Sequence, residues 1–251
     1  MHYAELDKAW AELTGPGAPF EITTVEVGGA PIRAFLAAPP SVRELWLSTL
    51  AFADRDYLVY EDERITYGEA HAKVAAIANW LMDQGVRPGD RVAVAMRNYP
   101  EWMLVYWAGV SIGVAVVGMN AWWTAGEMAY GFKDSDPKVV FADAERIARI
   151  AEQPGMLGDA VLVAVRADTV PPGAVSFADV LARGGDLPAV AVDPDSDACI
   201  FYTSGTTGFP KGAQLTHRGC VNNLMNMMFA GQVTSLATQR GTGVFLDPEA
   251  P

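Results

Sequence analysis

Short apolar runs alternate with helical patterns through the middle of the chain, and this alternation limits the possible folds more than any other feature. Runs rich in Val, Ile and Ala predict strands at 91–96, 114–117, 138–141, 160–165 and 198–202. The stretches between them predict helices at 100–112, 124–133, 144–151 and 177–183. Continuous apolar strands separated by helices are typical of a parallel sheet covered on both faces. We therefore expect a layered α/β fold with a mostly parallel sheet flanked by helices.

The segments before this region predict two hairpins and two helices. Extended runs flank Gly28-Gly29, and a second pair flanks the acidic turn Glu61-Asp62-Glu63, which is expected to be solvated. Ser41 is expected to cap a short helix, and Thr66 with Glu69 matches a capping box before a longer one. The apolar face of that longer helix comprises Ala70, Val74, Ile77, Ala78 and Leu81.

The domain organisation predicted from these patterns has three parts. Residues 1–40 form an N-terminal extension with a hairpin, 41–235 form the α/β domain, and 236–251 form an irregular tail. The last helix is expected to begin at Thr216, and its pattern decays after Gly231. One face of it would carry Val221, Leu224, Met225, Met228 and Phe229.

Composition excludes several classes of protein. The net charge of -12 disfavours nucleic-acid binding, and 51% hydrophobic residues in 251 are enough for a sizeable core. Cys199 and Cys220 lack metal-ligand spacing and are expected to be buried thiols, which fits a reducing cytoplasm. No secretory signal is expected at the N-terminus. The uncharged stretch 102–119 fits a buried helix and strand better than a membrane span, because three glycines interrupt it.

A loop rich in glycine and hydroxyl side chains, residues 202–213, carries the strongest chemical signal. Its sequence is Tyr-Thr-Ser-Gly-Thr-Thr-Gly-Phe-Pro-Lys-Gly-Ala. Glycines let the backbone approach an anion closely, hydroxyl groups donate hydrogen bonds, and a lysine supplies positive charge. The loop follows a predicted strand and precedes a predicted helix, where open α/β sheets bind ligands. These features predict a polyphosphate site.

Two better-known phosphate loops do not match. A Walker loop needs Gly immediately before the Lys and Ser or Thr after it, whereas Lys211 lies between Pro210 and Gly212. A kinase glycine loop has a different spacing and lies between two strands. We expect a strand, a loop and a helix here.

Residues 202–213 resemble the signature of the class I adenylate-forming (AMP-binding) enzymes, which include acyl-CoA synthetases, luciferases and peptide-synthetase adenylation domains. Residues 65–69 are similar to an early family motif, and 107–120 are similar to a second one. The resemblance covers about residues 41–235. Gly118-Met119-Asn120, without Asp, looks most like acyl-CoA synthetases (fatty-acid–CoA ligases).

The resemblance implies an acid–thiol ligase of fatty-acid or aryl-acid metabolism. Such enzymes activate a carboxylic acid with ATP and Mg²⁺ to an acyl-adenylate, then transfer the acyl group to CoA. By motif position, the phosphates would lie against Thr203, Ser204, Gly205, Thr206, Thr207, Gly208 and Lys211. Thr203 would be the residue nearest the metal. No catalytic residue is assigned within the 251 residues, because the family's catalytic lysine belongs to a C-terminal lid domain for which we find no counterpart.

We therefore expect this chain to be the incomplete large N-terminal domain of such an enzyme, inactive alone and prone to self-association. The expected location is the cytoplasm, with peripheral membrane contact left open. Three alternatives are a stand-alone nucleotide-binding or regulatory module, a ligase that loads a carrier protein, and a nonfunctional truncation that survives as a folding unit. The identity of the acid and of the acceptor thiol stays open.

Several other residues have two interpretations each. His217 either is solvated or packed, or touches substrate or phosphate, and the first is the simpler expectation. Met225, Met227 and Met228 fit core packing at helical spacing, or an acyl channel. Trp122 and Trp123 fit packing at a rim, or the mouth of an acyl channel or a dimer contact.

Overall fold

The computed structural model describes residues 2–203 and 208–242. The chain separates into two compact units, one spanning Ser41–His217 and the other combining residues 1–40 with 218–251. The second unit thus includes part of the range 41–235 that the sequence places in one domain. Each unit is described by itself.

The larger unit is built on a seven-stranded sheet in the order β11-β10-β6-β5-β7-β8-β9. Its strands are β5 (Arg91–Ala95), β6 (Ala115–Gly118), β7 (Val139–Asp143), β8 (Val161–Val165), β9 (Val175–Ser176), β10 (Asp197–Thr203) and β11 (Lys211–Thr216). Every neighbouring pair is parallel except β10 with β11. The predicted mostly parallel α/β sheet is confirmed.

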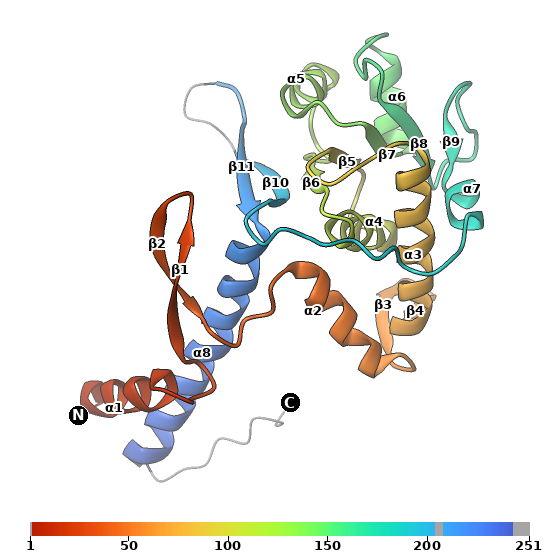
Figure 1. The fold of residues 1–251 in the computed structure, drawn as a ribbon. Coiled ribbons are helices and arrows are strands. Elements are labelled where there is room, and N and C mark those ends of the chain that lie inside the picture. The colour runs from red at the N-terminus through yellow and green to blue at the C-terminus, as the bar shows by residue number, and fades with distance from the viewer. Residues whose placement is uncertain (1, 204–207, 243–251) are drawn as a thin grey trace. The chain divides into compact units, whose positions relative to one another are not determined.

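Helices cover both faces of this sheet (Figure 1). On one face lie α5 (Ala125–Ser135) and α6 (Ala144–Ala151), whose Met128, Phe132 and Ile150 pack in one core with Ala93, Val117 and Val140 of the strands. On the other face Phe141 of β7 contacts Trp80 of α3 (Tyr67–Asp83) and Phe177 of α7 (Phe177–Ala182). The helix α4 (Pro100–Ser111) covers the same face and approaches β6 at Gly109, where a Cβ would lie 2.5 Å from Val116.

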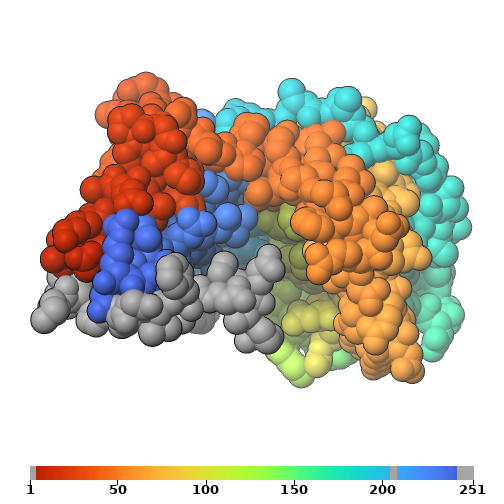
Figure 2. Space-filling model, turned by 90° about the horizontal axis from the view of Figure 1, so that it is seen from below, coloured from red at the N-terminus to blue at the C-terminus, as the bar shows by residue number. Residues whose placement is uncertain are grey.

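The elements that precede the sheet follow their local signals. They are α2 (Val42–Ser48), the 3-10 turn η1 (Thr49–Phe52), β3 (Asp56–Tyr60) and β4 (Glu63–Thr66). Ser41 caps α2, and Thr66 with Glu69 forms the expected capping box at α3. All five residues of the predicted apolar face of α3 are buried. In space-filling view these early residues form a continuous part of the surface of the larger unit (orange in Figure 2).

The smaller unit contains α1 (His2–Thr14), the hairpin β1 (Ile22–Val27) and β2 (Ala30–Phe35), and α8 (His217–Thr242) after its first residue. Phe20 and Phe229 lie at the centre of its apolar cluster, with Ala9, Val233 and Ala237. The hairpin was predicted, but α1 was not. Its Leu6, Ala9 and Leu13 recur at helical spacing, so the signal was present in a short segment.

Two expectations about the last helix are wrong. It continues to Thr242 instead of decaying after Gly231, because Val233 and Ala237 still find apolar partners. Residues 236–242 are thus helical, and 243–251 lie outside the described residues. Leu224 and Met228 are 39% and 50% exposed, so the buried face is narrower than predicted. Among the residues described, no helix is both long and apolar enough to cross a membrane.

Candidate functional site

A hollow of about 350 Å³ lies at the carboxyl ends of β6 and β10. These two strands pair in parallel, so the segments that leave them meet at one edge of the sheet. From β5 the chain passes to β6 on one side and later to β7 on the other, so the switch point where open α/β sheets hold ligands lies at the carboxyl end of β5, next to β6. The lining residues are Asn120, Trp122, Trp123, Glu127, Tyr202, Thr203, Gly208, Phe209 and Pro210.

The strands that flank the glycine-rich segment pair as a hairpin, so the predicted order of strand, loop and helix is wrong. β10 and β11 are antiparallel, with Thr203 opposite Lys211, and α8 begins only at His217. Our expectation was wrong because Lys211–Thr216 are enough residues to pair with the otherwise open edge of β10. Because this loop also lies between two strands, its position no longer distinguishes it from a kinase glycine loop. The different spacing of its glycines still does.

The structure brings some of the predicted phosphate ligands together. Thr203 and Lys211 are cross-strand partners, so their side chains project from the same face of the hairpin. Both are exposed, and the Thr203 hydroxyl donates to the Lys211 carbonyl at 3.4 Å. Gly208 has a φ of 94°, a left-handed conformation that favours glycine. Ser204, Gly205, Thr206 and Thr207 lie outside the described residues.

Tyr202 anchors the base of the hairpin to α5. Its ring meets the ring of Trp123 edge to face at 5.2 Å, and its hydroxyl donates to Asp134 at 2.7 Å. Burial and the neighbouring Asp134 carboxylate raise the pKa of Tyr202, so the hydroxyl stays a donor. Gly131 leaves room for this contact, since a Cβ there would lie 2.6 Å from the Trp123 ring. On the far side of the turn, the Phe209 ring lies 5.1 Å from that of Tyr130.

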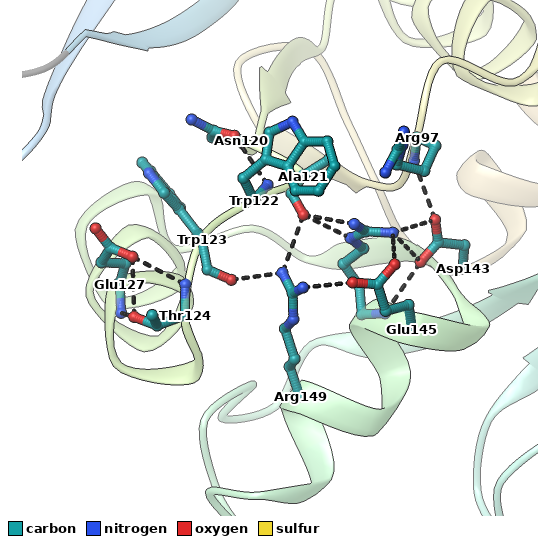
Figure 3. Close-up of polar contacts among 11 residues, drawn as sticks. Arg97, Asn120, Ala121, Trp122, Trp123, Thr124, Glu127, Asp143, Glu145 and Arg149 are labelled. Carbon is teal, nitrogen blue, oxygen red and sulfur yellow. Dashed lines mark hydrogen bonds and ion pairs between the residues drawn. The ribbon is translucent and has the colours of Figure 1, made fainter.

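The segment that leaves β6 forms a second wall of the hollow. Figure 3 shows the residues Asn120 to Thr124 of this segment and their polar contacts. The Asn120 side chain accepts from the Trp122 N–H at 2.9 Å, which shapes a tight turn. Thr124 then caps α5 in a capping box with Glu127, at the start of the helix that the sequence predicts at 124–133. The Thr124 backbone N–H holds the pKa of Glu127 below its ordinary value, so this lining residue is a carboxylate at neutral pH.

Trp122 and Trp123 have different surroundings. Trp123 is 6% exposed and packs in the core between the sheet and α5. Trp122 is 69% exposed and lies beneath the guanidinium of Arg97, 4.3 Å from its ring centroid. A second hollow of about 400 Å³ lies on this side, lined by Tyr60, Arg97, Asn98, Tyr99, Ala121, Trp122 and Glu145. The interpretation as a packing residue therefore fits Trp123, whereas Trp122 borders both hollows.

His217 is fully buried and packs, as the simpler interpretation holds. Its Nδ1 accepts from the Val42 N–H at 3.3 Å, and its Nε2 is a buried atom without a hydrogen-bond partner in the described part of the chain. Burial lowers its pKa to about 4, so the ring is neutral at pH 7. His71 stacks on Trp46 at 3.9 Å and contacts the Thr49 hydroxyl, a pairing that the sequence did not indicate.

The methionines of α8 do not follow either prediction as a group. Met225 packs against the smaller unit's apolar cluster, but Met227 and Met228 are 67% and 50% exposed. Cys199 is buried and Cys220 is half-buried, and neither forms a disulfide within the described residues. Among these residues no three His, Cys, Asp or Glu side chains gather as a metal site.

Sequence reasoning missed the residues that hold the wall in place. Asp143 and Arg146 lie at the start of α6, directly after the carboxyl end of β7, and Arg149 lies in its last turn. The side chains of Arg146 and Arg149 reach the segment after β6, and Asp143 holds Arg146. A usable signal existed: an Asp followed by Arg three residues later, immediately after an apolar strand, is an N-cap next to the switch point.

Comparison with known proteins identifies the family. The family model described as "AMP-binding enzyme" matches residues 47–245. The chain belongs to the AMP-binding enzymes. This AMP-binding chain is 31% identical over 178 residues to the 4-coumarate–CoA ligase CCL1 of Humulus lupulus, covering 69% of this chain and 32% of the relative. It is 35% identical over 164 residues to the long-chain-fatty-acid–CoA ligase FadD13 of Mycobacterium tuberculosis, covering 62% and 30%.

Solved structures agree on the fold of the AMP-binding chain. The structure of ATP-bound MatB from Rhodopseudomonas palustris matches with a TM-score of 0.59 at 29% identity, covering 71% of this chain and 35% of that one. An anthranilate CoA ligase, AuaEII, solved with anthranoyl-AMP, matches with a TM-score of 0.66 at 24% identity, covering 71% and 35%. The AMP-binding chain spans about a third of the length of these curated relatives.

Proposed function

We propose that the hollow beside the β10–β11 hairpin holds the polyphosphate of ATP for the activation of a carboxylic acid. The observation that carries this proposal is the cross-strand pair of Lys211 with Thr203, which lines the hollow, in a chain of the AMP-binding family. A hydroxyl donor and an ammonium group on one face of a hairpin suit phosphate oxygens, which accept both kinds of hydrogen bond. The proposed phosphate loop comprises Thr203, Gly208 and Lys211 together with Ser204, Gly205, Thr206 and Thr207.

The chain's own residues would act by positioning and charge. Lys211 would neutralise negative charge on the phosphates, and the Thr203 hydroxyl would orient them. The indole of Trp122 and the ring of Phe209 would exclude water from one side of the hollow. Mg²⁺ prefers oxygen ligands and keeps substrate phosphates and water in its shell, so the Thr203 hydroxyl fits as one of its ligands. When bound, the ion would screen phosphate charge.

The complete reaction would be an acid–thiol ligation that forms an acyl-adenylate and then an acyl-CoA. Support for a fatty or aryl acid comes from the names of the relatives, which are CoA ligases for 4-coumarate and for long-chain fatty acids. CoA as the acceptor, and fatty-acid metabolism as the setting, rest on the same relatives. A carrier-protein-loading ligase is the alternative acceptor chemistry.

Binding of Mg-ATP by the whole chain, measured by calorimetry, tests the site. Lys211→Ala should weaken the affinity about tenfold or more, because a hydrogen bond to a charged group contributes about 1.5–3 kcal/mol. Lys138→Ala is a matched control, since Lys138 lies at the amino end of β7 and pairs with Asp90 there. The affinity of Lys138→Ala for Mg-ATP should stay within about twofold of that of the original chain. Equal affinities for the original chain and Lys211→Ala would overturn the proposal.

A turnover assay separates a ligase from a binding module. We expect this chain to bind ATP weakly and to release no pyrophosphate with a carboxylic acid present, because no residue here matches the family's catalytic lysine. Steady pyrophosphate release would show that the chain is competent alone. Tight binding of ATP without turnover, even when the acid and CoA are supplied, would favour the regulatory module.

Self-association of the chain stays a prediction, supported by exposed apolar side chains on α8. Leu224, Met227 and Met228 are 39%, 67% and 50% exposed. Apolar surface of this kind promotes association. A mass from light scattering that rises with concentration would agree, and a monomer at all concentrations would contradict it.

A further inference from the structure

Two arginines of α6 hold the wall segment Asn120–Thr124 by its backbone (Figure 3). The Ala121 carbonyl accepts from Arg146 Nε at 2.9 Å, from Arg146 Nη2 at 2.5 Å and from Arg149 Nη1 at 3.0 Å. Arg149 Nη1 also donates to the Trp123 carbonyl at 2.7 Å. Four hydrogen bonds from charged donors therefore converge on a five-residue segment without secondary structure of its own.

Arg146 is itself held in one orientation by Asp143. The two side chains are 1% and 5% exposed, and Arg146 Nη1 lies 2.8 Å from Asp143 Oδ2. Asp143 accepts in addition from the backbone N–H groups of Arg146 and Arg97, at 3.0 Å each. A planar guanidinium directs one edge to the carboxylate and another to the Ala121 carbonyl, and the point charge of a lysine cannot reproduce this geometry.

The held segment leads directly to the hollow beside the hairpin. Asn120, Trp122 and Trp123 line that hollow, and the Trp123 ring contacts Tyr202, whose neighbour is Thr203. We propose that Arg146, assisted by Arg149, is a positioning residue for the polyphosphate site: it sets the wall against which the β10–β11 hairpin rests. This inference rests on the proposed function. It gives α6 a role in ordering the site, although its arginines need not contact the nucleotide.

Arg91 provides a matched comparison at the opposite end of the same sheet. Its Nε donates to the Ser135 carbonyl at 2.7 Å, and its Nη2 donates to the Asp136 carbonyl at 2.9 Å. It therefore holds the backbone after α5 by the same chemistry, next to the amino end of β5 and away from the hollow. Arg91→Lys and Arg146→Lys remove the same kind of contact at the two ends.

Hydrogen exchange of the whole chain without nucleotide tests the positioning directly. The Trp122 and Trp123 N–H groups donate to Asn120, so their exchange reports the order of the wall segment. Arg146→Lys should accelerate exchange at these amides about tenfold, and Arg91→Lys should leave them unchanged. Equal exchange there in both variants would overturn the inference. Arg149→Lys, at a side chain 22% exposed, is a second variant if Arg146→Lys does not fold.

Mg-ATP binding by the same variants then separates this inference from the proposed function. Arg146→Lys should bind about tenfold more weakly than the original chain, and Arg91→Lys within about twofold. An original chain that does not bind Mg-ATP contradicts the proposed function, while the hydrogen exchange still decides whether Arg146 orders the segment. An original chain that binds, with Arg146→Lys binding equally well, contradicts the positioning role alone.

Discussion

The two walls of the hollow differ in how tightly they are packed. One wall follows β6, near the centre of the sheet, and the other is the β10–β11 hairpin at its edge. At the centre, the segment after β6 is held by a buried ion pair and by the core residue Trp123. At the edge, Thr203, Phe209 and Lys211 are exposed, and among the strands that the structure describes β11 pairs only with β10. The groups proposed to touch phosphate lie on the lightly packed wall, opposite a tightly packed one.

This difference has a physical basis. A phosphate ligand needs exposed donors and room for the chain to adjust, and both reduce local stability. Precise placement of such donors then depends on a second wall that does not move. The comparison predicts that removing a core side chain at the centre lowers stability, whereas substitutions at the edge weaken binding with little change in stability.

The largest expected difference is between the two adjacent tryptophans. Trp123→Ala should lower the free energy of unfolding by about 3–5 kcal/mol, because it removes a buried aromatic side chain from the core. Trp122→Ala should change it by less than about 1 kcal/mol, since that side chain is 69% exposed. Urea unfolding followed by circular dichroism measures both. Similar losses in the two variants would show that the centre is not the rigid wall.

A smaller effect is expected at His217, where the edge hairpin returns to the interior. Burial lowers its pKa in the folded chain to about 4, and Glu44 and Asp193 offset part of that shift. Below about pH 6.5, the pKa of His217 in the unfolded chain, the unfolded chain binds a proton at this side chain and the folded chain does not. This group therefore contributes a loss of stability as pH falls from about 6.5 to 4, up to roughly 3 kcal/mol, and no change above pH 6.5.

The variant His217→Asn isolates this contribution. Its side-chain oxygen can accept from the Val42 N–H in place of Nδ1, and it does not titrate. The difference in unfolding free energy between the original chain and His217→Asn should therefore depend on pH between 4 and 6.5 and be flat above. A difference independent of pH would contradict the buried, neutral histidine.

The smallest effect on stability is expected at the edge itself. Thr203→Val keeps a β-branched side chain in β10 but removes the hydroxyl, so the free energy of unfolding should change by no more than about 0.5 kcal/mol. Mg-ATP binding should nevertheless weaken by about fivefold, in line with the loss of one hydrogen bond of about 1 kcal/mol. Unchanged binding together with a large loss of stability would reverse the comparison.

Most of the fold was predictable because its signals are local. Thr66 and Thr124 start helices with hydroxyl caps, and continuous Val and Ala runs mark strands that are buried on both faces. The family resemblance of residues 202–213 is equally local, because it rests on the order of glycine, hydroxyl and lysine residues within these twelve positions. The short N-terminal helix α1 and the edge strand β11 were not predicted, because both depend on pairing or packing with distant segments.

By itself the sequence determined the α/β class, the family and the residues proposed to bind phosphate. Only the tertiary structure decided that Lys211 lies on a strand opposite Thr203, that Trp123 is buried while Trp122 is exposed, and that Arg146 reaches the Ala121 carbonyl. Each of these depends on which distant segments lie next to one another. Arg146 and Ala121 are 25 residues apart, and nothing in the local pattern of either specifies that contact. It arises because β5 lies between β6 and β7, with the carboxyl ends of all three at one edge of the sheet.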